Sequence, residues 1–191
     1  MAFEKFDVSK LERLNDERRF DVLSPDVMWS ALGDPSPLAI IDIGAGTGLF
    51  ARRFAALAPA AQVYAADSSA TMVDWMVENV PEDLRSRLHP VLAGEATVPL
   101  PDATADLVVM IHLHHELADP LASYREALRL LRPGGQLLVV DWAPSEGPAG
   151  PPQHIRVTAE DAAAMLREAG FASVTAHPLL TQDSLLTAAR P

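Results

Sequence analysis

The sequence predicts an α/β protein, in which a doubly wound and mostly parallel sheet is covered by helices on both faces. The apolar run at 38–41 is followed by Asp42, a glycine-rich turn at 44–48 and a segment with the helical period. Further short apolar runs alternate with helix-period segments almost to the C-terminus. Several of these runs end on a polar residue or a glycine, which is where parallel sheets hold their ligands.

Length and composition favour one globular domain. The chain has 191 residues, of which 49% are hydrophobic and 21% are charged. This is enough chain to bury one sizeable core and too little for two. We therefore expect one domain over 1–191, consisting of an N-terminal helical arm at 1–35 and an α/β core at 36–191.

The charge and the absence of cysteine exclude several classes of function. The formal net charge is −11, with Lys5 and Lys10 as the only lysines, whereas nucleic-acid binding usually needs a basic surface. We expect no nucleic-acid partner, and the same charge disfavours anionic membranes. The lack of cysteine excludes disulfides, thiolate metal sites and cysteine nucleophiles, and it fits a cytoplasmic protein. No apolar run approaches the ~20 residues of a membrane span.

The N-terminal arm has two interpretations. Residues 1–20 carry scattered apolar groups among charges, so they either pack on the domain or form a lid that brings Arg18 or Arg19 to a ligand. A helix is expected over 22–32, with Ser24 as its N-cap and Pro25 at its first position.

The glycine turn is the central feature of the chain. Glycine permits positive φ and lets a ligand approach the backbone closely. The helix expected over 49–57 starts directly after it and offers free N–H groups at its first turn. A dinucleotide motif would require glycine at position 49, where Leu49 stands.

The second strand is expected over 62–66 and ends at Asp67. A carboxylate there, about 20 residues past the glycines, is placed to accept hydrogen bonds from both hydroxyls of a ribose. Ser68 or Ser69 would cap the next helix. In that helix Met72 is either a core residue or lies beneath a flat ligand base.

The rest of the chain supplies the remaining elements. A Pro- and Gly-rich loop at 143–153 would lie over the carboxyl ends of the strands. Arg132-Pro133-Gly134-Gly135 would end a helix and turn into the fifth strand. Strands are expected over 87–92, 106–111, 137–140, 171–177 and 184–189, the last two as an antiparallel hairpin, and helices are expected from 119–120 and from Thr158 to Gly170.

The histidines at 112–115, with Glu116, follow the fourth strand. We expect no metal site, because adjacent residues on one turn rarely face the same ion. His112 and His115 are either candidates for a general base or packing residues at the end of the strand. Asp141, after the fifth strand, is either a base or a carboxylate that caps a loop.

These polar positions are expected to form one cleft. The glycine turn, Asp67, Glu95, His112 and Asp141 fall at the ends of separate strands. Since the carboxyl ends of parallel strands share one edge of the sheet, they would meet there.

In this order and spacing the motifs resemble the class I S-adenosylmethionine-dependent methyltransferases, of the small seven-stranded, type 11-like kind. The residues that carry the resemblance are DIGAGTG at 42–48, Asp67, Gly94-Glu95-Ala96 with the Pro-rich loop to Asp106, His112 to His115, RPGG at 132–135 and Ala169-Gly170-Phe171.

The resemblance implies a Rossmann-like domain with strand order 3-2-1-4-5-7-6 and an antiparallel last strand. It also implies S-adenosylmethionine as cofactor and S-adenosylhomocysteine as product. Asp42 would lie near the amino group of the cofactor, Asp67 would hold its ribose, and Ser68, Glu95 and Ala96 would meet its adenine. The full set of implied cofactor residues is Asp42, Gly44, Ala45, Gly46, Asp67, Ser68, Met72, Gly94, Glu95, Ala96, Ile111 and His112.

The implied function is methyl transfer to a small-molecule acceptor, with His112, His115 and Asp141 as catalytic candidates. An in-line displacement needs an aligned nucleophile and a site that excludes water. Two alternatives remain: a protein that binds S-adenosylmethionine without catalysis, and a nicotinamide-dependent oxidoreductase, against which Leu49 counts. The sequence specifies neither the acceptor nor the oligomeric state.

Overall fold

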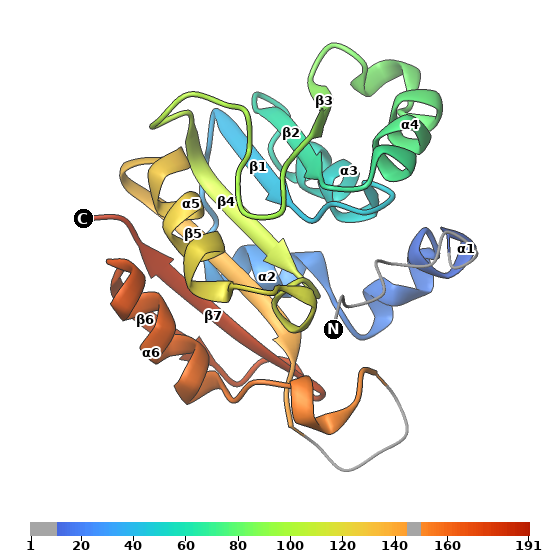
Figure 1. Ribbon diagram of the computed structural model, residues 1–191. Helices are drawn as coiled ribbons and strands as arrows, with labels where there is room; N and C mark the ends of the chain where they lie inside the picture. The colour runs from blue at the N-terminus through green and yellow to red at the C-terminus, as the bar shows by residue number, and fades with distance from the viewer. Residues whose placement is uncertain (1–10, 145–149) are drawn as a thin grey trace.

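The computed structural model describes residues 11–144 and 150–191, and it confirms the expected α/β architecture (Figure 1). Seven strands form one sheet in the order β3-β2-β1-β4-β5-β7-β6. Strands β1 to β5 are parallel, and β7 runs antiparallel to both of its neighbours, as expected. The strands are β1 (Ala39–Ile43), β2 (Gln62–Asp67), β3 (Leu88–Leu92), β4 (Ala105–Ile111), β5 (Leu131–Trp142), β6 (Ala172–His177) and β7 (Asp183–Ala189).

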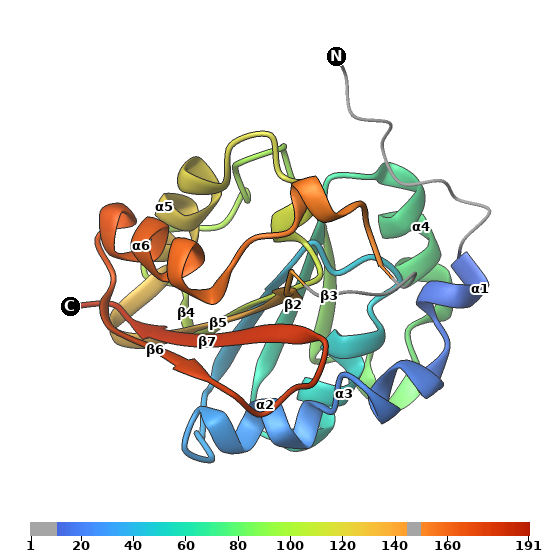
Figure 2. The same cartoon turned by 90° about the horizontal axis from the view of Figure 1, so that it is seen from below.

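Helices cover both faces of this sheet. In Figure 2, α2 and α3 lie on one side of the strands, and α5 and α6 lie on the other. The helices are α1 (Leu11–Leu14), α2 (Pro25–Ala31), α3 (Leu49–Leu57), α4 (Ala70–Asn79), α5 (Pro120–Leu130) and α6 (Ala159–Ala169), and the 3-10 turns are η2 (Glu17–Asp21), η3 (Glu82–Leu84), η4 (His114–Glu116) and η5 (Gln153–Ile155).

Side-chain caps explain where four helices begin. Ser24 accepts a hydrogen bond from the Val27 N–H, with Pro25 as the first residue of α2. The next cap, which the sequence left open between two serines, is Ser69. Asp119 and Thr158 cap α5 and α6 in the same way. These caps satisfy N–H groups that have no partner within the helix.

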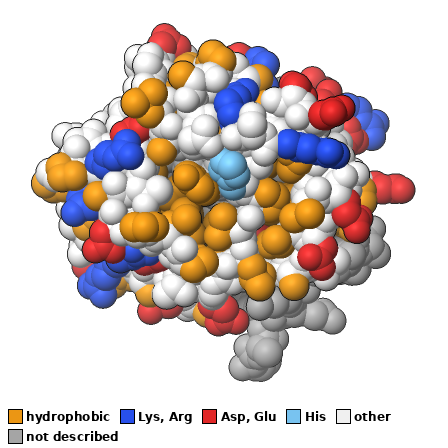
Figure 3. Space-filling model, turned by 90° about the horizontal axis from the view of Figure 1, so that it is seen from above, with side chains coloured by type: hydrophobic (Ala, Val, Ile, Leu, Met, Phe, Trp, Pro, Cys, Tyr) orange, Lys and Arg blue, Asp and Glu red, His pale blue; other side chains and the backbone are white. Residues whose placement is uncertain are grey.

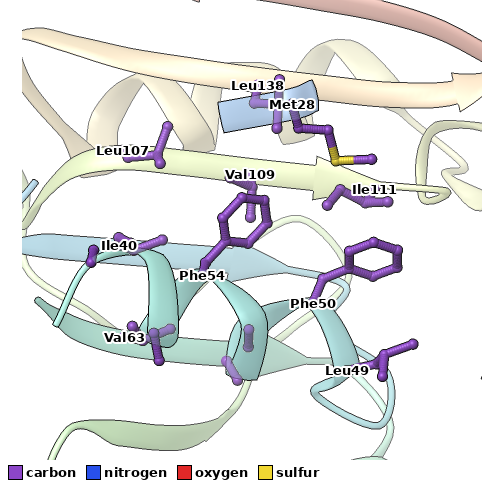
Figure 4. Close-up of a cluster of buried hydrophobic side chains, with 14 of the residues drawn as sticks. Met28, Ile40, Leu49, Phe50, Phe54, Val63, Leu107, Val109, Ile111 and Leu138 are labelled. Carbon is purple, nitrogen blue, oxygen red and sulfur yellow. The ribbon is translucent and has the colours of Figure 1, made fainter. Parts of the chain in front are cut away.

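The first hydrophobic core lies between the sheet and α2, α3 and α4 (Figure 4). Phe54 points from α3 towards β1 and β4, and Met28 from α2 closes the same layer; both are fully buried. The second core lies on the opposite face, where Tyr124 and Leu166 pack against the strands. Ile40 belongs to the first core and its neighbour Ile41 to the second. This explains why the strand reads as a continuous apolar run.

The fifth strand is longer than the sequence predicts, so the expected turn at 132–135 is wrong in its extent. Ala105 pairs with Leu131 and Leu107 pairs with Gln136, so four residues of β5, at 132–135, lie opposite a single residue of β4. Gly134 supports this bulge with φ of +79°. Gly134 donates its N–H to the Arg190 carbonyl, and the Arg190 N–H donates to the Gly135 carbonyl, so the end of the chain holds the bulge.

The surface shows no concentration of acidic charge on the face of Figure 3. Hydrophobic side chains gather there around a histidine, and acidic side chains lie mainly towards the rim. In the part of the chain that the structure describes, no helix is both long enough and apolar enough to cross a membrane.

Candidate active site

The tips of β1 and β2 are joined through the glycine turn. Gly44 and Ala45 both donate their N–H to the Ala66 carbonyl, at 2.8 and 3.0 Å. The Asp67 carboxylate accepts the N–H of Gly46 at 2.8 Å through Oδ2 and that of Ser69 at 2.9 Å through Oδ1. Gly44 and Gly46 have φ of +74° and +56°, a region that other residues rarely adopt. The turn is therefore fixed by backbone geometry and by Asp67 together.

Asp42 lies at the end of β1 with only 3% of its surface exposed. Burial, together with the negative charge of Asp67, raises the pKa of Asp42 to about 8, although the positive charge of Arg19 acts in the opposite direction. Asp42 is therefore protonated at neutral pH until a cation comes close enough to stabilise its charge.

The N-terminal arm reaches the glycine turn. A Cβ added to Gly46 would lie 3.4 Å from Cδ1 of Leu14 in α1. Of the two arginines named from the sequence, Arg18 is exposed and pairs with Asp16, whereas Arg19 is drawn inward over the Phe50 ring. The parts of the arm before residue 11, and residues 145–149 of the Pro-rich loop, lie outside the described residues. Whether either segment acts as a lid stays a prediction.

A second polar cluster follows β4. His112, with φ of +54°, places Nε2 2.7 Å from Oδ1 of Asp183. His115 places Nδ1 2.8 Å from Oδ1 of Asp141. The two rings are 6.4 Å apart, centre to centre. Two histidine–carboxylate pairs therefore lie side by side at the carboxyl edge of the sheet.

The two carboxylates of this cluster are almost fully buried, with exposed side-chain fractions of 2% for Asp183 and 3% for Asp141. Burial of the His115 ring opposes its protonation, but the hydrogen bond and the charge of Asp141 outweigh it, so the pKa of His115 is raised. Asp141 also accepts the N–H of Trp142 at 2.8 Å. The carboxylate thus holds the ring in one orientation.

His114 has a different environment from its two neighbours. Its Nδ1 lies 2.7 Å from the Tyr124 hydroxyl, and both residues are buried. Burial lowers the pKa of His114. His114 is the first residue of η4 and packs against Tyr124 of α5, so it does not join the cluster. Within 11–144 and 150–191, no group of three or more His, Asp or Glu side chains is arranged to hold a metal ion.

Two residues of the cluster were missed by the sequence analysis. Trp142 stacks on His112 with 4.7 Å between ring centres. Asp183 is the first residue of β7 and lies opposite Trp142 of β5 in the antiparallel ladder. A signal for Asp183 was present: because β7 is antiparallel, its first residue lies at the edge where the parallel strands end. The expected strand began one residue later, at 184.

The other predicted cofactor residues differ in exposure. Met72 is 2% exposed and Ile111 is 6% exposed, so both side chains are buried. Gly94 and Glu95 are exposed on the loop after β3. That loop starts at Ala93, whose N–H donates to the Asp67 carbonyl at 2.9 Å. The assignment of Ser68, Glu95 and Ala96 to an adenine stays a prediction.

A family model described as a methyltransferase domain matches residues 41–139, just over half of the chain. The chain belongs to this methyltransferase family. The match begins in β1 and extends into β5, so it includes the glycine turn, Asp67 and the two histidines, and it ends before Asp141 and Asp183.

Individual relatives agree with the family. The chain is 37% identical over 124 residues to the ubiquinone/menaquinone biosynthesis C-methyltransferase UbiE of Caulobacter vibrioides, covering 62% of this chain and 49% of the relative. It is 35% identical over 105 residues to the malonyl-[acyl-carrier protein] O-methyltransferase of Hahella chejuensis, covering 53% and 36%. The chain thus spans about half the length, or less, of these curated relatives.

Among solved structures, a SAM-dependent methyltransferase from Aquifex aeolicus superposes with a TM-score of 0.89 at 26% identity. The match covers 98% of this chain and 100% of that chain. The similarity therefore extends beyond the family match, across both cores and the antiparallel strand.

The carboxylates in the site of this methyltransferase fit S-adenosylmethionine, the cofactor named for the Aquifex aeolicus protein. The Asp67 carboxylate stands at the tip of β2, where it can accept hydroxyl hydrogens as well as the two N–H groups it already binds. Buried Asp42 provides an acceptor for an ammonium group, and the carboxylates would repel the phosphates of a dinucleotide.

Proposed function

We propose that this methyltransferase transfers the methyl group of S-adenosylmethionine to a small-molecule acceptor that loses a proton. The observation that carries the proposal is the pair of histidine–carboxylate contacts, at 2.7 and 2.8 Å, at the ends of β4, β5 and β7. They share the carboxyl edge of the sheet with the glycine turn (Figure 1). A base next to the cofactor is useful when the acceptor's proton must leave.

The cofactor, when bound, supplies a methyl group on a positively charged sulfur. The chain's own residues do the remaining work. Gly44, Ala45 and Gly46 let the cofactor approach the backbone, and Asp67 orients its ribose. Ile111 and His112 bound the side of the site near β4. Exclusion of water by these walls favours the displacement, because a desolvated nucleophile and aligned groups react faster.

His115 takes the acceptor's proton on Nε2. Since a carboxylate only accepts hydrogen bonds, Asp141 keeps the other ring nitrogen, Nδ1, protonated. This fixes the tautomer in which Nε2 is the basic atom. His112 has the opposite arrangement, because Asp183 is bound to its Nε2 and leaves Nδ1 as the basic atom. Asp141 and Asp183 thus act as positioning residues, and the histidines are the candidate bases.

The name of one relative, a C-methyltransferase of ubiquinone and menaquinone biosynthesis, supports a small acceptor. A second relative is named as an O-methyltransferase of malonyl-[acyl-carrier protein], so the relatives leave the acceptor atom open. We propose that the described segments act as one methyltransferase domain, in which the arm before α2 contributes to the site. Its acidic, cysteine-free composition supports an activity in the cytoplasm without a nucleic-acid partner.

The test is a screen for turnover with methyl-labelled S-adenosylmethionine and small acceptors, with release of S-adenosylhomocysteine as the readout. The panel should contrast phenols and enols, which lose a proton on methylation, with carboxylates, which are already ionised at neutral pH. We expect His115→Gln to lose about 10²-fold or more with the phenol or enol acceptors, the scale of general base catalysis, and much less with a carboxylate. The exposed Glu160→Gln is the control.

An equal loss in His115→Gln with both kinds of acceptor, or no loss with either, would contradict the role of a base. Tight cofactor binding without turnover of any acceptor would favour the alternative of a binding protein without catalysis.

A further inference from the structure

The guanidinium of Arg19 occupies an unusual position beside the glycine turn. Its Nη1 donates to the Leu14 carbonyl at 3.0 Å, and its central carbon lies 5.1 Å from the centre of the Phe50 ring. Phe50 is in the first turn of α3, which starts directly after the glycines. Leu14 in turn approaches Gly46. Arg19 is therefore held between the arm and the start of α3.

Arg19 is half-buried, and it forms no ion pair with the described residues although carboxylates are near. Burial lowers the pKa of Arg19, while the negative charges of Asp42 and Asp183 act to raise it. Within residues 11–144 and 150–191, no carboxylate oxygen lies within 4.0 Å of its guanidinium, and the Leu14 carbonyl is its single hydrogen-bond acceptor. A guanidinium carries five N–H donors, so most of them lack an acceptor from these residues. A partly desolvated cation gains from a charged hydrogen-bond partner, which favours an anion in this place.

The pair of Arg19 and Asp42 is complementary to the head of an α-amino acid. Such a head carries one carboxylate and one ammonium group on the same carbon, and it needs a cation and a carboxylate close together. Asp42 lies at the end of β1 and Arg19 is close enough to influence its charge. A planar guanidinium also matches a carboxylate with two parallel hydrogen bonds.

We propose that Arg19 binds the α-carboxylate of the cofactor's methionine end, next to the amino group that Asp42 receives. This inference rests on the proposed function, because it assumes that S-adenosylmethionine is the ligand. The N-terminal arm therefore takes part in binding, because η2 carries Arg19 beside the methionine end of the cofactor. Arg18, one position earlier, has no such role, because its side chain is exposed and bound to Asp16.

The experiment compares two ligands by calorimetric titration. One is S-adenosylhomocysteine, and the other is its decarboxylated analogue S-adenosylthiopropylamine, which keeps the adenosine and the amino group. The wild type should bind the analogue about 10–100-fold more weakly, the range of hydrogen bonds to a charged group. In Arg19→Ala the affinity for S-adenosylhomocysteine should fall by about the same factor, while the affinity for the analogue changes little. Arg18→Ala should bind both ligands as the wild type does.

The ratio of the two affinities separates a binding role from a structural one. If Arg19 merely held the arm in place, Arg19→Ala would weaken both ligands equally and leave the ratio unchanged, which would overturn the inference. A wild type that binds S-adenosylhomocysteine no better than the analogue would also overturn it, while leaving the proposed function intact. A wild type that binds neither ligand would contradict the proposed function itself.

Discussion

Oδ1 of Asp183 lies 2.7 Å from Nε2 of His112, and this contact joins the first residue of β7 to the end of β4. His112 is held there with φ of +54°, stacked on Trp142. A left-handed backbone at a residue other than glycine costs about 1–2 kcal/mol. Such strain persists where the surrounding contacts over-determine it, and it is often found at functional sites.

The first prediction concerns the tautomer of His112. With Asp183 as acceptor, the neutral ring carries its hydrogen on Nε2, so nitrogen-15 NMR of labelled protein should show this tautomer as the main form. Asp183→Ala removes the acceptor, and the two tautomers should then both be populated. A spectrum of His112 that is identical in the wild type and in Asp183→Ala would contradict the contact.

The second prediction concerns the pKa of His115. Because Asp141 stabilises the protonated ring, Asp141→Asn should lower the pKa of His115 in an NMR titration. The raised pKa also implies a stabilising contribution that is fully present below about pH 6.5, the ordinary value, and is lost as the pH rises through the pKa of the folded state. Asp141→Asn should remove this pH dependence. Glu116→Gln is the control, because its carboxylate is half-exposed and lies 3.7 Å from the ring; its effect should be smaller.

The third prediction concerns the buried Asp42. Its pKa of about 8 in the folded protein lies above the ordinary value of 3.8. Between about pH 4 and 8 the folded state keeps a proton that the unfolded state has lost, so the free energy of unfolding should fall as the pH rises, and the contribution of this group should level off above pH 8. Asp42→Asn should remove this slope.

Urea unfolding of both proteins from pH 5 to 8 would measure the difference. At pH 8 the variant should be the more stable protein by at least about 1 kcal/mol, since one pKa unit corresponds to about 1.4 kcal/mol. Parallel pH profiles for Asp42→Asn and the wild type would show that Asp42 is ionised throughout, against this expectation.

The fourth prediction separates the backbone role of Gly46 from its role in binding. Gly46 and Gly33 both have positive φ, at +56° and +79°, so alanine should destabilise the fold at either position by about 1–2 kcal/mol. A Cβ at Gly33 meets no atom within 4 Å, and Gly33 lies in the loop before β1, at the opposite end of that strand from the glycine turn. Gly46→Ala should therefore lose affinity for S-adenosylhomocysteine in calorimetry, while Gly33→Ala keeps it. Equal affinities would mean that the glycine turn is structural only.

The sequence predicted those parts of the molecule that local signals determine. The glycine turn and the helix caps follow from short motifs, because caps and turns depend on neighbouring residues, whereas the order of the strands was expected from the family resemblance. The ends of β5 could not be predicted in this way. The bulge at 132–135 depends on pairing with β4 on both of its sides and on hydrogen bonds to Arg190, and partners distant in sequence leave no local pattern.

The same distinction applies to the site. His112, His115 and Asp141 could be named because each follows an apolar strand. Asp183 comes 71 residues after His112, and its contact depends on the antiparallel course of β7. The different role of His114 depends on Tyr124 in α5, which takes the ring into the core. The choice between Arg18 and Arg19 depended on how the arm packs against Phe50.

We infer that the glycine turn, Asp42 and Asp67 form a site for S-adenosylmethionine. Parallel calorimetric titrations of the wild type with S-adenosylmethionine, S-adenosylhomocysteine and NAD measure this directly. We expect micromolar binding of the first two and no binding of NAD. Binding of NAD in place of the two adenosyl compounds would contradict it.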